Sequence, residues 1–144
     1  GRALANSKLD KFDTALTDYT RAIELDPLAF RAFNNRAVIY VKLRLFERAL
    51  LDYDEALRLK PQEPRIRHNR ATALLALRRL QPAIRDFSSA IELDPDNGTS
   101  YAGRGIAYLL QGENDLAARD FNRARNLGYK QPLHRNAPVP ELQV

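Results

Sequence analysis

Apolar and polar residues recur along this chain with the spacing of amphipathic α-helices, and the helical stretches come in pairs. About residues 30–59 hold one such pair, in which Leu50, Tyr53 and Leu57 place an apolar stripe on one face of the second segment. Pro61 ends this segment, because proline has no N–H to donate and disfavours helix at the residue before it. Only a short break separates the two segments, and short breaks join antiparallel neighbours. The pattern therefore predicts helix hairpins.

The hairpin pattern repeats four times at a constant interval. Pro27, Pro61 and Pro95 are evenly spaced, and Ile23–Pro27 recurs unchanged as Ile91–Pro95. Four further columns keep the same period, three of small residues and one of aromatic residues. They are Ala15, Ala49, Ala83 and Ala117; Ala22, Ala56, Ala90 and Ala124; Ala3, Ala37, Ala71 and Gly105; and Tyr19, Tyr53, Phe87 and Phe121. Small residues let helix axes approach closely, so these columns predict helix crossings.

The repeat resembles the tetratricopeptide repeat, a helix hairpin of about 34 residues. Phe33, Ala37 and Tyr40 match the opening aromatic, small and tyrosine places of that family, whereas Arg67 and Leu74 depart from them in the third copy. The resemblance implies an all-α, right-handed superhelical solenoid of antiparallel helix pairs over residues 1–131. Its four copies span about 1–29, 30–63, 64–97 and 98–131, followed by a proline-rich extended tail over 132–144. We expect seven or eight helices and no strand, with breaks near Pro27, Leu45, Pro61, Arg79, Pro95 and Gly112.

The two ends of the solenoid differ. In the fourth copy, Ala118 and Arg125 replace the large apolar residues that face the next repeat in earlier copies, which suits a surface with no next repeat. Gly128 then provides a helix stop that can adopt a left-handed conformation. The first copy opens inside a helix and lacks its first residues. We therefore expect further repeats, or at least part of a helix, before Gly1.

Two charged columns run through the repeats, and each aspartate follows its arginine at the same distance along the chain. The columns are Arg2, Arg36, Arg70 and Arg104, and Asp18, Asp52, Asp86 and Asp120. One interpretation is a charged ladder for a ligand. We favour structural Arg–Asp pairs, because strict repetition serves the stacking of repeats and arginine binds carboxylates with two parallel hydrogen bonds.

By helical projection, and by resemblance to the family, the first helix of each copy lines a concave groove that binds peptides. The alternative is a solvated helix face, but concave solenoid surfaces are the usual binding faces. Asparagine both donates and accepts, so Asn35 and Asn69 are suited to hold the backbone of an extended peptide, and Arg31, Arg65 and Lys42 to hold carboxylates. The expected groove residues are Leu4, Ser7 and Lys8; Arg31, Asn34, Asn35, Val38 and Lys42; Arg65, His68, Asn69, Thr72 and Ala76; and Ala102, Gly103, Ile106 and Leu110.

One subclass of the family binds the C-termini of chaperones through a carboxylate clamp of Lys, Asn, Asn, Lys and Arg. Asn35 and Arg65 match two of these places, but Leu4 and Asn69 stand where an Asn and an Arg are needed. The other register is incomplete as well, so we do not predict chaperone binding. His68 lacks a partner at helical spacing and is expected to be a groove contact rather than a catalyst.

Composition narrows the class of function. There are no cysteines and only two histidines, and no motif of a nucleophile, a metal site or a phosphate loop is present, so we expect no enzyme, no metal and no cofactor. The formal net charge of +5 keeps a nucleic-acid-binding repeat as the alternative, although the aromatic column is needed for packing. The expected partner is a protein or peptide; nucleic acid is disfavoured and no membrane insertion is expected. The sequence does not determine the cellular compartment, although we favour the cytoplasm.

The tail from Lys130 cannot form a regular helix, because Pro132, Pro138 and Pro140 interrupt it. We expect it to be extended and docked in one of two ways. It covers the last helix around Phe121, which is the arrangement we favour, or it enters the groove of a neighbouring molecule as a mimic of a peptide ligand. The second arrangement would allow self-association through the tail.

Overall fold

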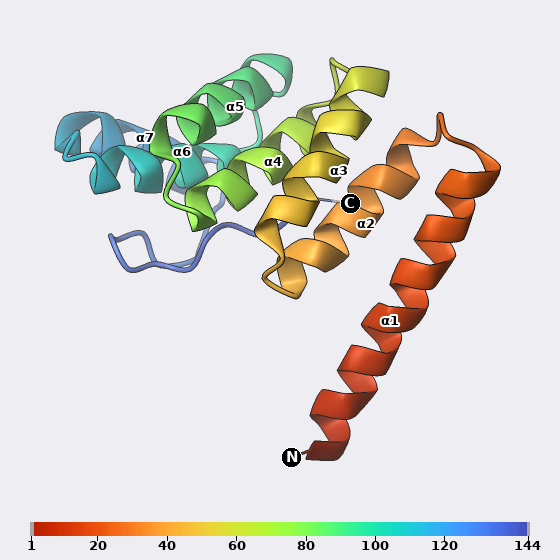
Figure 1. Cartoon of the computed structure of the whole chain (residues 1–144). Helices are drawn as coiled ribbons and strands as arrows, with labels where there is room; N and C mark the ends of the chain where they lie inside the picture. Colours follow the sequence, from red (N-terminus) through yellow and green to blue (C-terminus); the bar gives the residue numbers. More distant parts are fainter. Residues whose placement is uncertain (1, 144) are drawn as a thin grey trace. The chain divides into compact units, whose positions relative to one another are not determined.

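The computed structural model describes residues 2–143, with side chains from Ser7 onward. Over this range the chain forms seven α-helices and no strand, as expected from the repeat. Two compact units are distinguished, unit 1 up to Pro61 and unit 2 from Gln62 to Gln143. Unit 1 holds α1 (Arg2–Leu25), α2 (Phe30–Lys42) and α3 (Phe46–Leu59), and unit 2 holds α4 (Pro64–Ala76), α5 (Leu80–Leu93), α6 (Gly98–Leu110) and α7 (Asn114–Asn126) (Figure 1).

The helices of a hairpin are joined by the same turn in three copies. Arg44, Arg78 and Gly112 have positive φ angles of 60°, 61° and 84° and follow one another at the period of the repeat. After Arg44, the Leu45 N–H donates to the Tyr40 carbonyl over 2.8 Å, and the equivalent bonds after Arg78 and Gly112 are 2.9 Å long. This is the Schellman arrangement, which satisfies carbonyl groups at the end of a helix. Gly128, with φ 97°, ends α7 in the same way, as its sequence position predicts.

The first copy lacks this turn. Asp10, which stands one period of the repeat before Arg44, lies inside α1, and α1 runs unbroken to Leu25. Figure 1 shows α1 as one straight helix whose N-terminal half extends past the end of α2.

The small and aromatic columns form the cores of the hairpins. In unit 1, Ala49, Tyr53 and Ala56 are fully buried where α3 packs on α2. In unit 2, Ala83 and Ala90 on α5 are equally inaccessible. The prediction that these four alanines lie at helix contacts is therefore confirmed.

Two glycines allow α6 to approach its neighbours more closely than alanine would. A Cβ atom on Gly103 would lie 2.3 Å from Cζ of Phe87 on α5, and one on Gly105 would lie 2.6 Å from Cδ1 of Phe121 on α7. Both rings are buried. The glycines thus fix how α6 fits between α5 and α7, and α6 also contacts α4. This arrangement brings the N-terminal half of α4 next to α6.

Candidate functional site

The repeated arginines are held in structural ion pairs. Arg36 Nε donates to Asp52 Oδ2 over 2.7 Å, and a second bond of 2.7 Å joins its terminal nitrogen to Oδ1. The Asp52 side chain is only 7% exposed, and its hydrogen bond raises the pKa of Arg36. In unit 2, Arg70 and Arg104 make the same two-pronged contact with Asp86 and Asp120. The prediction that these three guanidinium groups pair with the aspartate column is confirmed.

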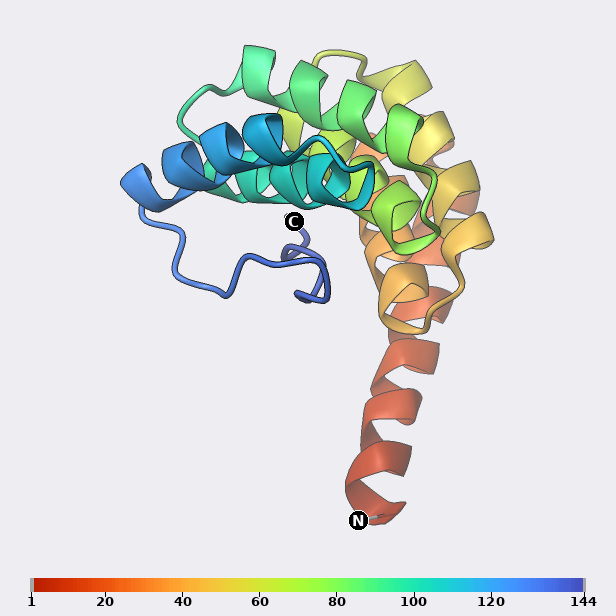
Figure 2. The same cartoon turned by 90° about the vertical axis from the view of Figure 1, so that its left-hand side faces the viewer.

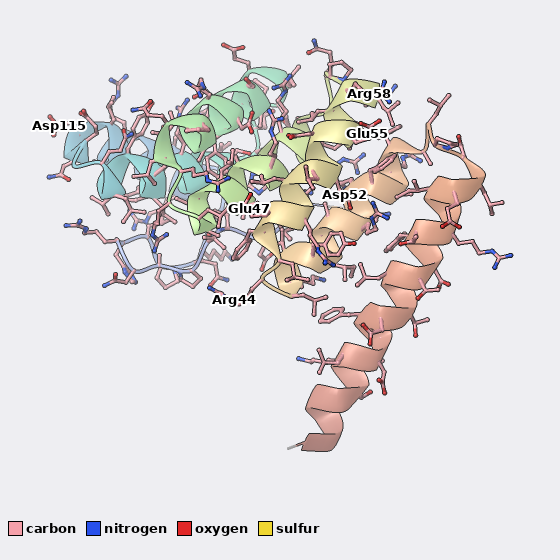
Figure 3. The ribbon with its side chains drawn as sticks, viewed as in Figure 1. Arg44, Glu47, Asp52, Glu55, Arg58 and Asp115 are labelled. Carbon is pink, nitrogen blue, oxygen red and sulfur yellow. The ribbon has the colours of Figure 1, made fainter. Side chains whose placement is uncertain are left out.

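The first copy has no equivalent pair within reach. Arg2 and Asp18 both lie on the unbroken α1, which separates them by about 24 Å along the helix axis. The side chain of Arg2 itself lies outside the described part of the chain. At the surface of unit 1, Arg58 pairs with Glu55 one turn away near the C-terminal end of α3 (Figure 3). This pair is an exposed ion pair between residues one helical turn apart, and such pairs contribute little to stability.

His68 and Asn69 on α4 form the centre of the candidate site in unit 2. Both side chains are fully buried. His68 Nδ1 lies 2.9 Å from Oγ of Ser100 on α6, and its ring meets the Phe87 ring edge-on with centroids 5.6 Å apart. Thr72, one turn later on α4, is also buried and donates its hydroxyl to the His68 carbonyl.

The end of the C-terminal tail is bound to these two side chains. Asn69 Nδ2 donates to the Gln143 carbonyl, and the Gln143 N–H donates to Asn69 Oδ1 over 2.6 Å. His68 Nε2 lies 2.9 Å from the carbonyl oxygen of Glu141. All three contacts are to the tail backbone, at residues two apart. Alternate residues of an extended chain face the same side, so the tail lies on α4 in the manner of a strand.

The contact with the tail determines which ring nitrogen of His68 carries the hydrogen. A carbonyl oxygen only accepts, so Nε2 carries the hydrogen and Nδ1 of the neutral ring accepts from the Ser100 hydroxyl. Burial lowers the pKa of His68 to about 4, while the hydrogen bond with the Glu141 carbonyl acts in the opposite direction. The ring is therefore neutral at pH 7 and serves as a fixed hydrogen-bond bridge between α6 and the tail.

The route of the tail differs from the arrangement we favoured. The described tail residues contain no helix, as the prolines predict. The tail does not end over Phe121; it runs back along unit 2 (Figure 2) and reaches α4 of its own chain. On the way, Glu141 helps to enclose a pocket of about 280 Å³ with Thr99, Leu127 and Tyr129. Burial and the nearby Glu141 raise the pKa of Tyr129.

The remaining expected groove residues lie in different surroundings. Lys8, Arg31 and Lys42 are exposed in unit 1, where Asn34 and Val38 are buried and Asn35 is half-buried. In unit 2, Ile106 is buried on α6, and Arg65 is exposed and pairs with Glu63 over 3.2 Å. The side chain of Leu4 lies outside the described part of the chain.

Ser100 is a residue of the candidate site that was not predicted from the sequence. The equivalent positions in the second and third copies are Ala32 and Ile66. A polar residue at an otherwise apolar position of the repeat could have indicated that Ser100 belongs to the site. The backbone contacts of Glu141 and Gln143 have no such signal, because any residue presents the same N–H and C=O groups.

Among residues 2–143 no three His, Asp or Glu side chains gather as a metal site requires. In the same range none of the helices combines the length and apolar character needed to cross a bilayer.

The chain resembles several solved helical-repeat structures. The structure "MamA 41-end from Desulfovibrio magneticus RS-1" aligns with a TM-score of 0.76 and 20% identity, covering 86% of this chain and 70% of that one. The "Arabidopsis OM64 TPR domain" aligns at 0.71 with 28% identity, covering 73% and 87%. "First TPR of Spaghetti (RPAP3) bound to HSP90 peptide SRMEEVD" aligns at 0.67 with 23% identity, covering 69% and 79%.

A comparison with the sequences of curated proteins found no match. The family model described as "Tetratricopeptide repeat" matches residues 1–64 and 68–130, which is most of the chain. Together with the seven helices and the repeated hairpin turn, this match shows that the chain belongs to the tetratricopeptide repeat family.

Proposed function

We propose that the chain is a non-enzymatic interaction module whose α4 and α6 bind an extended segment of a partner protein. The observation that carries this proposal is the pairing of Asn69 with both the N–H and the carbonyl of Gln143. A buried side-chain amide in this orientation recognises a peptide backbone of any sequence. His68 adds a third backbone contact two residues earlier, at Glu141.

The surroundings of these side chains favour such a ligand. His68, Thr72 and Ser100 are fully buried, so hydrogen bonds made here exchange little with water. Neutral donors and acceptors line the contact, which suits the uncharged backbone of a peptide. The ion pairs of the arginine column are already satisfied within the hairpins and are not required for binding.

The peptide-bound structure with the same fold is consistent with this use of the surface. Its sequence identity of 23% to this chain supports the shared fold only. The chaperone clamp stays incomplete in this sequence, because Asn69 stands in place of an arginine. We therefore expect a ligand recognised through its backbone and its apolar side chains rather than through a terminal carboxylate.

A random library of displayed 12-residue peptides, selected against the full chain, tests the proposal. Selected peptides should bind the unaltered chain, as measured by calorimetry, and should lose at least about tenfold in affinity with Asn69→Ala, since two buried hydrogen bonds are removed. Asn122→Ala, on the exposed face of α7, is the matched control and should not change the affinity. Peptides that bind equally well to the Asn69→Ala chain would contradict the proposed site.

A further inference from the structure

We propose that residues 140–143 are an intramolecular ligand, so that the chain occupies its own peptide site and an incoming peptide has to displace the tail. This inference rests on the proposed function and adds the regulation of the same site. It is carried by the three backbone contacts that the tail makes with His68 and Asn69.

Burial divides the tail into two segments, an anchor of residues 140–143 and a linker of residues 130–139. Pro140 is the one buried residue among 129–143, and Leu142 and Gln143 are half-buried. Most of the residues between Lys130 and Val139 are exposed. A turn at His134, where the Ala137 N–H donates to the His134 carbonyl over 3.0 Å, redirects the chain. The anchor is thus held at the site while the linker makes few contacts.

The geometry of the anchor is that of a peptide ligand rather than of a packed part of the fold. The side-chain identities of Glu141 and Gln143 are not used in the contacts with α4, which involve backbone atoms only. A separate extended peptide presents the same groups at the same spacing. It therefore competes with the tail for Asn69 and His68, and both cannot be bound at once.

The short linker gives the tail a large advantage in this competition. A flexible tether of about ten residues holds its ligand at an effective concentration in the millimolar range. If the site is open for a small fraction of the time, the apparent affinity for an external peptide is reduced by that fraction. Release of the tail should consequently strengthen the binding of external peptides by at least about tenfold.

Gln143→Pro tests the inference in the full chain. Proline removes the N–H that donates to Asn69 and leaves all residues of α4 and α6 unchanged. Val139→Pro is the matched control, because it adds a proline to the exposed part of the same tail, before Pro140, where the backbone is already extended. Circular dichroism verifies that both variants keep their helices.

Two measurements are made on each protein. Backbone ¹⁵N relaxation of Glu141 and Leu142 reports whether the anchor is ordered. A synthetic peptide of residues 137–144, titrated in trans, reports whether the site is accessible. The anchor should be ordered in the unaltered chain and in Val139→Pro and mobile in Gln143→Pro. The peptide should bind Gln143→Pro at least about tenfold more tightly than the other two.

The failures of the two proposals are distinguishable. A mobile anchor in the unaltered chain would overturn the inference, while library peptides that depend on Asn69 would still support the proposed function. An ordered anchor whose release does not strengthen peptide binding would also overturn it, since the tail would then be a permanent part of the fold. If no library peptide binds even Gln143→Pro, the proposed function itself is wrong.

Discussion

Asn69 and Gln143 lie 74 residues apart in the chain and exchange two hydrogen bonds, as two residues of neighbouring strands do. Here, however, the Gln143 backbone pairs with the side chain of Asn69 on helix α4 and not with the backbone of a strand. His68, the preceding residue of α4, makes a further contact with the tail backbone, at the carbonyl of Glu141. The order of the tail therefore depends on two adjacent side chains of α4.

Asn69→Asp should release the tail while α4 stays helical. The carboxylate keeps the acceptor for the Gln143 N–H but replaces the donor to its carbonyl with a second oxygen, which repels that carbonyl. Hydrogen exchange of the Gln143 amide should accelerate about fivefold to tenfold, because a hydrogen bond of roughly 1–1.5 kcal/mol is lost. Unchanged exchange would show that other contacts hold the tail.

The burial of His68 makes stability depend on pH. The pKa of His68 is about 4 in the folded chain and about 6.5 when exposed, so the unfolded chain binds an extra proton between these values. The free energy of unfolding should fall as the pH is lowered through this window, by about 2 kcal/mol between pH 7 and 5. The part of the loss that comes from His68 should disappear in His68→Gln.

Chemical denaturation at pH 7, 6 and 5 measures this dependence. Asn122→Ala, at an exposed position on α7, is the control and should keep the full dependence of the unaltered chain. An identical fall in stability in His68→Gln and in the unaltered chain would contradict the assignment.

Tyr53→Phe should stabilise the chain. The Tyr53 hydroxyl is buried and has no hydrogen-bond partner among the described residues, and burial raises the pKa of this side chain. Phe87 and Phe121 occupy the same column in later copies, so the site accepts phenylalanine. Removal of an unsatisfied buried hydroxyl should add about 1 kcal/mol to the free energy of unfolding. Tyr19→Phe, at the half-buried position of the first copy, should change it by less than about 0.5 kcal/mol.

The repeat made the helices predictable because each hairpin satisfies local rules. Pro61 and Pro95 each stand two residues after the end of a helix, because proline cannot continue it. The left-handed turns at Arg44, Arg78 and Gly112 recur with the period. The continuous α1 was not predictable from the period alone. Asp10 stands at the place of this turn but lies inside α1. The residue type does not mark the difference, because Arg44 and Arg78 adopt the left-handed turn without being glycine.

The candidate site was predictable only in part. Asn69 and His68 were expected to face a binding surface because their positions on the first helix of a copy follow from the repeat. The position of the tail was not, since its contacts with α4 use backbone groups that every residue carries. Whether the surface serves a partner stays a prediction, and the peptide experiments above decide it.

Gly103→Ala should destabilise the chain through a steric conflict. The new Cβ would lie 2.3 Å from Cζ of Phe87, whose ring is fully buried and cannot swing out into solvent. Overpacking of about 3 kcal/mol outweighs the gain of about 1 kcal/mol in helix propensity, so a net loss of about 2 kcal/mol is expected. Thermal and urea unfolding measure the difference.

A double-mutant cycle separates this conflict from backbone strain. Gly112→Ala is the control: nothing lies within 4 Å of its new Cβ, and its cost of about 1 kcal/mol comes from the φ angle of 84° alone. Phe87→Leu shortens the obstructing ring. In that background the loss caused by Gly103→Ala should shrink, whereas the loss caused by Gly112→Ala should add to that of Phe87→Leu without interaction. If the losses caused by Gly103→Ala and Phe87→Leu were also simply additive, the close approach of α6 to α5 would not depend on this glycine.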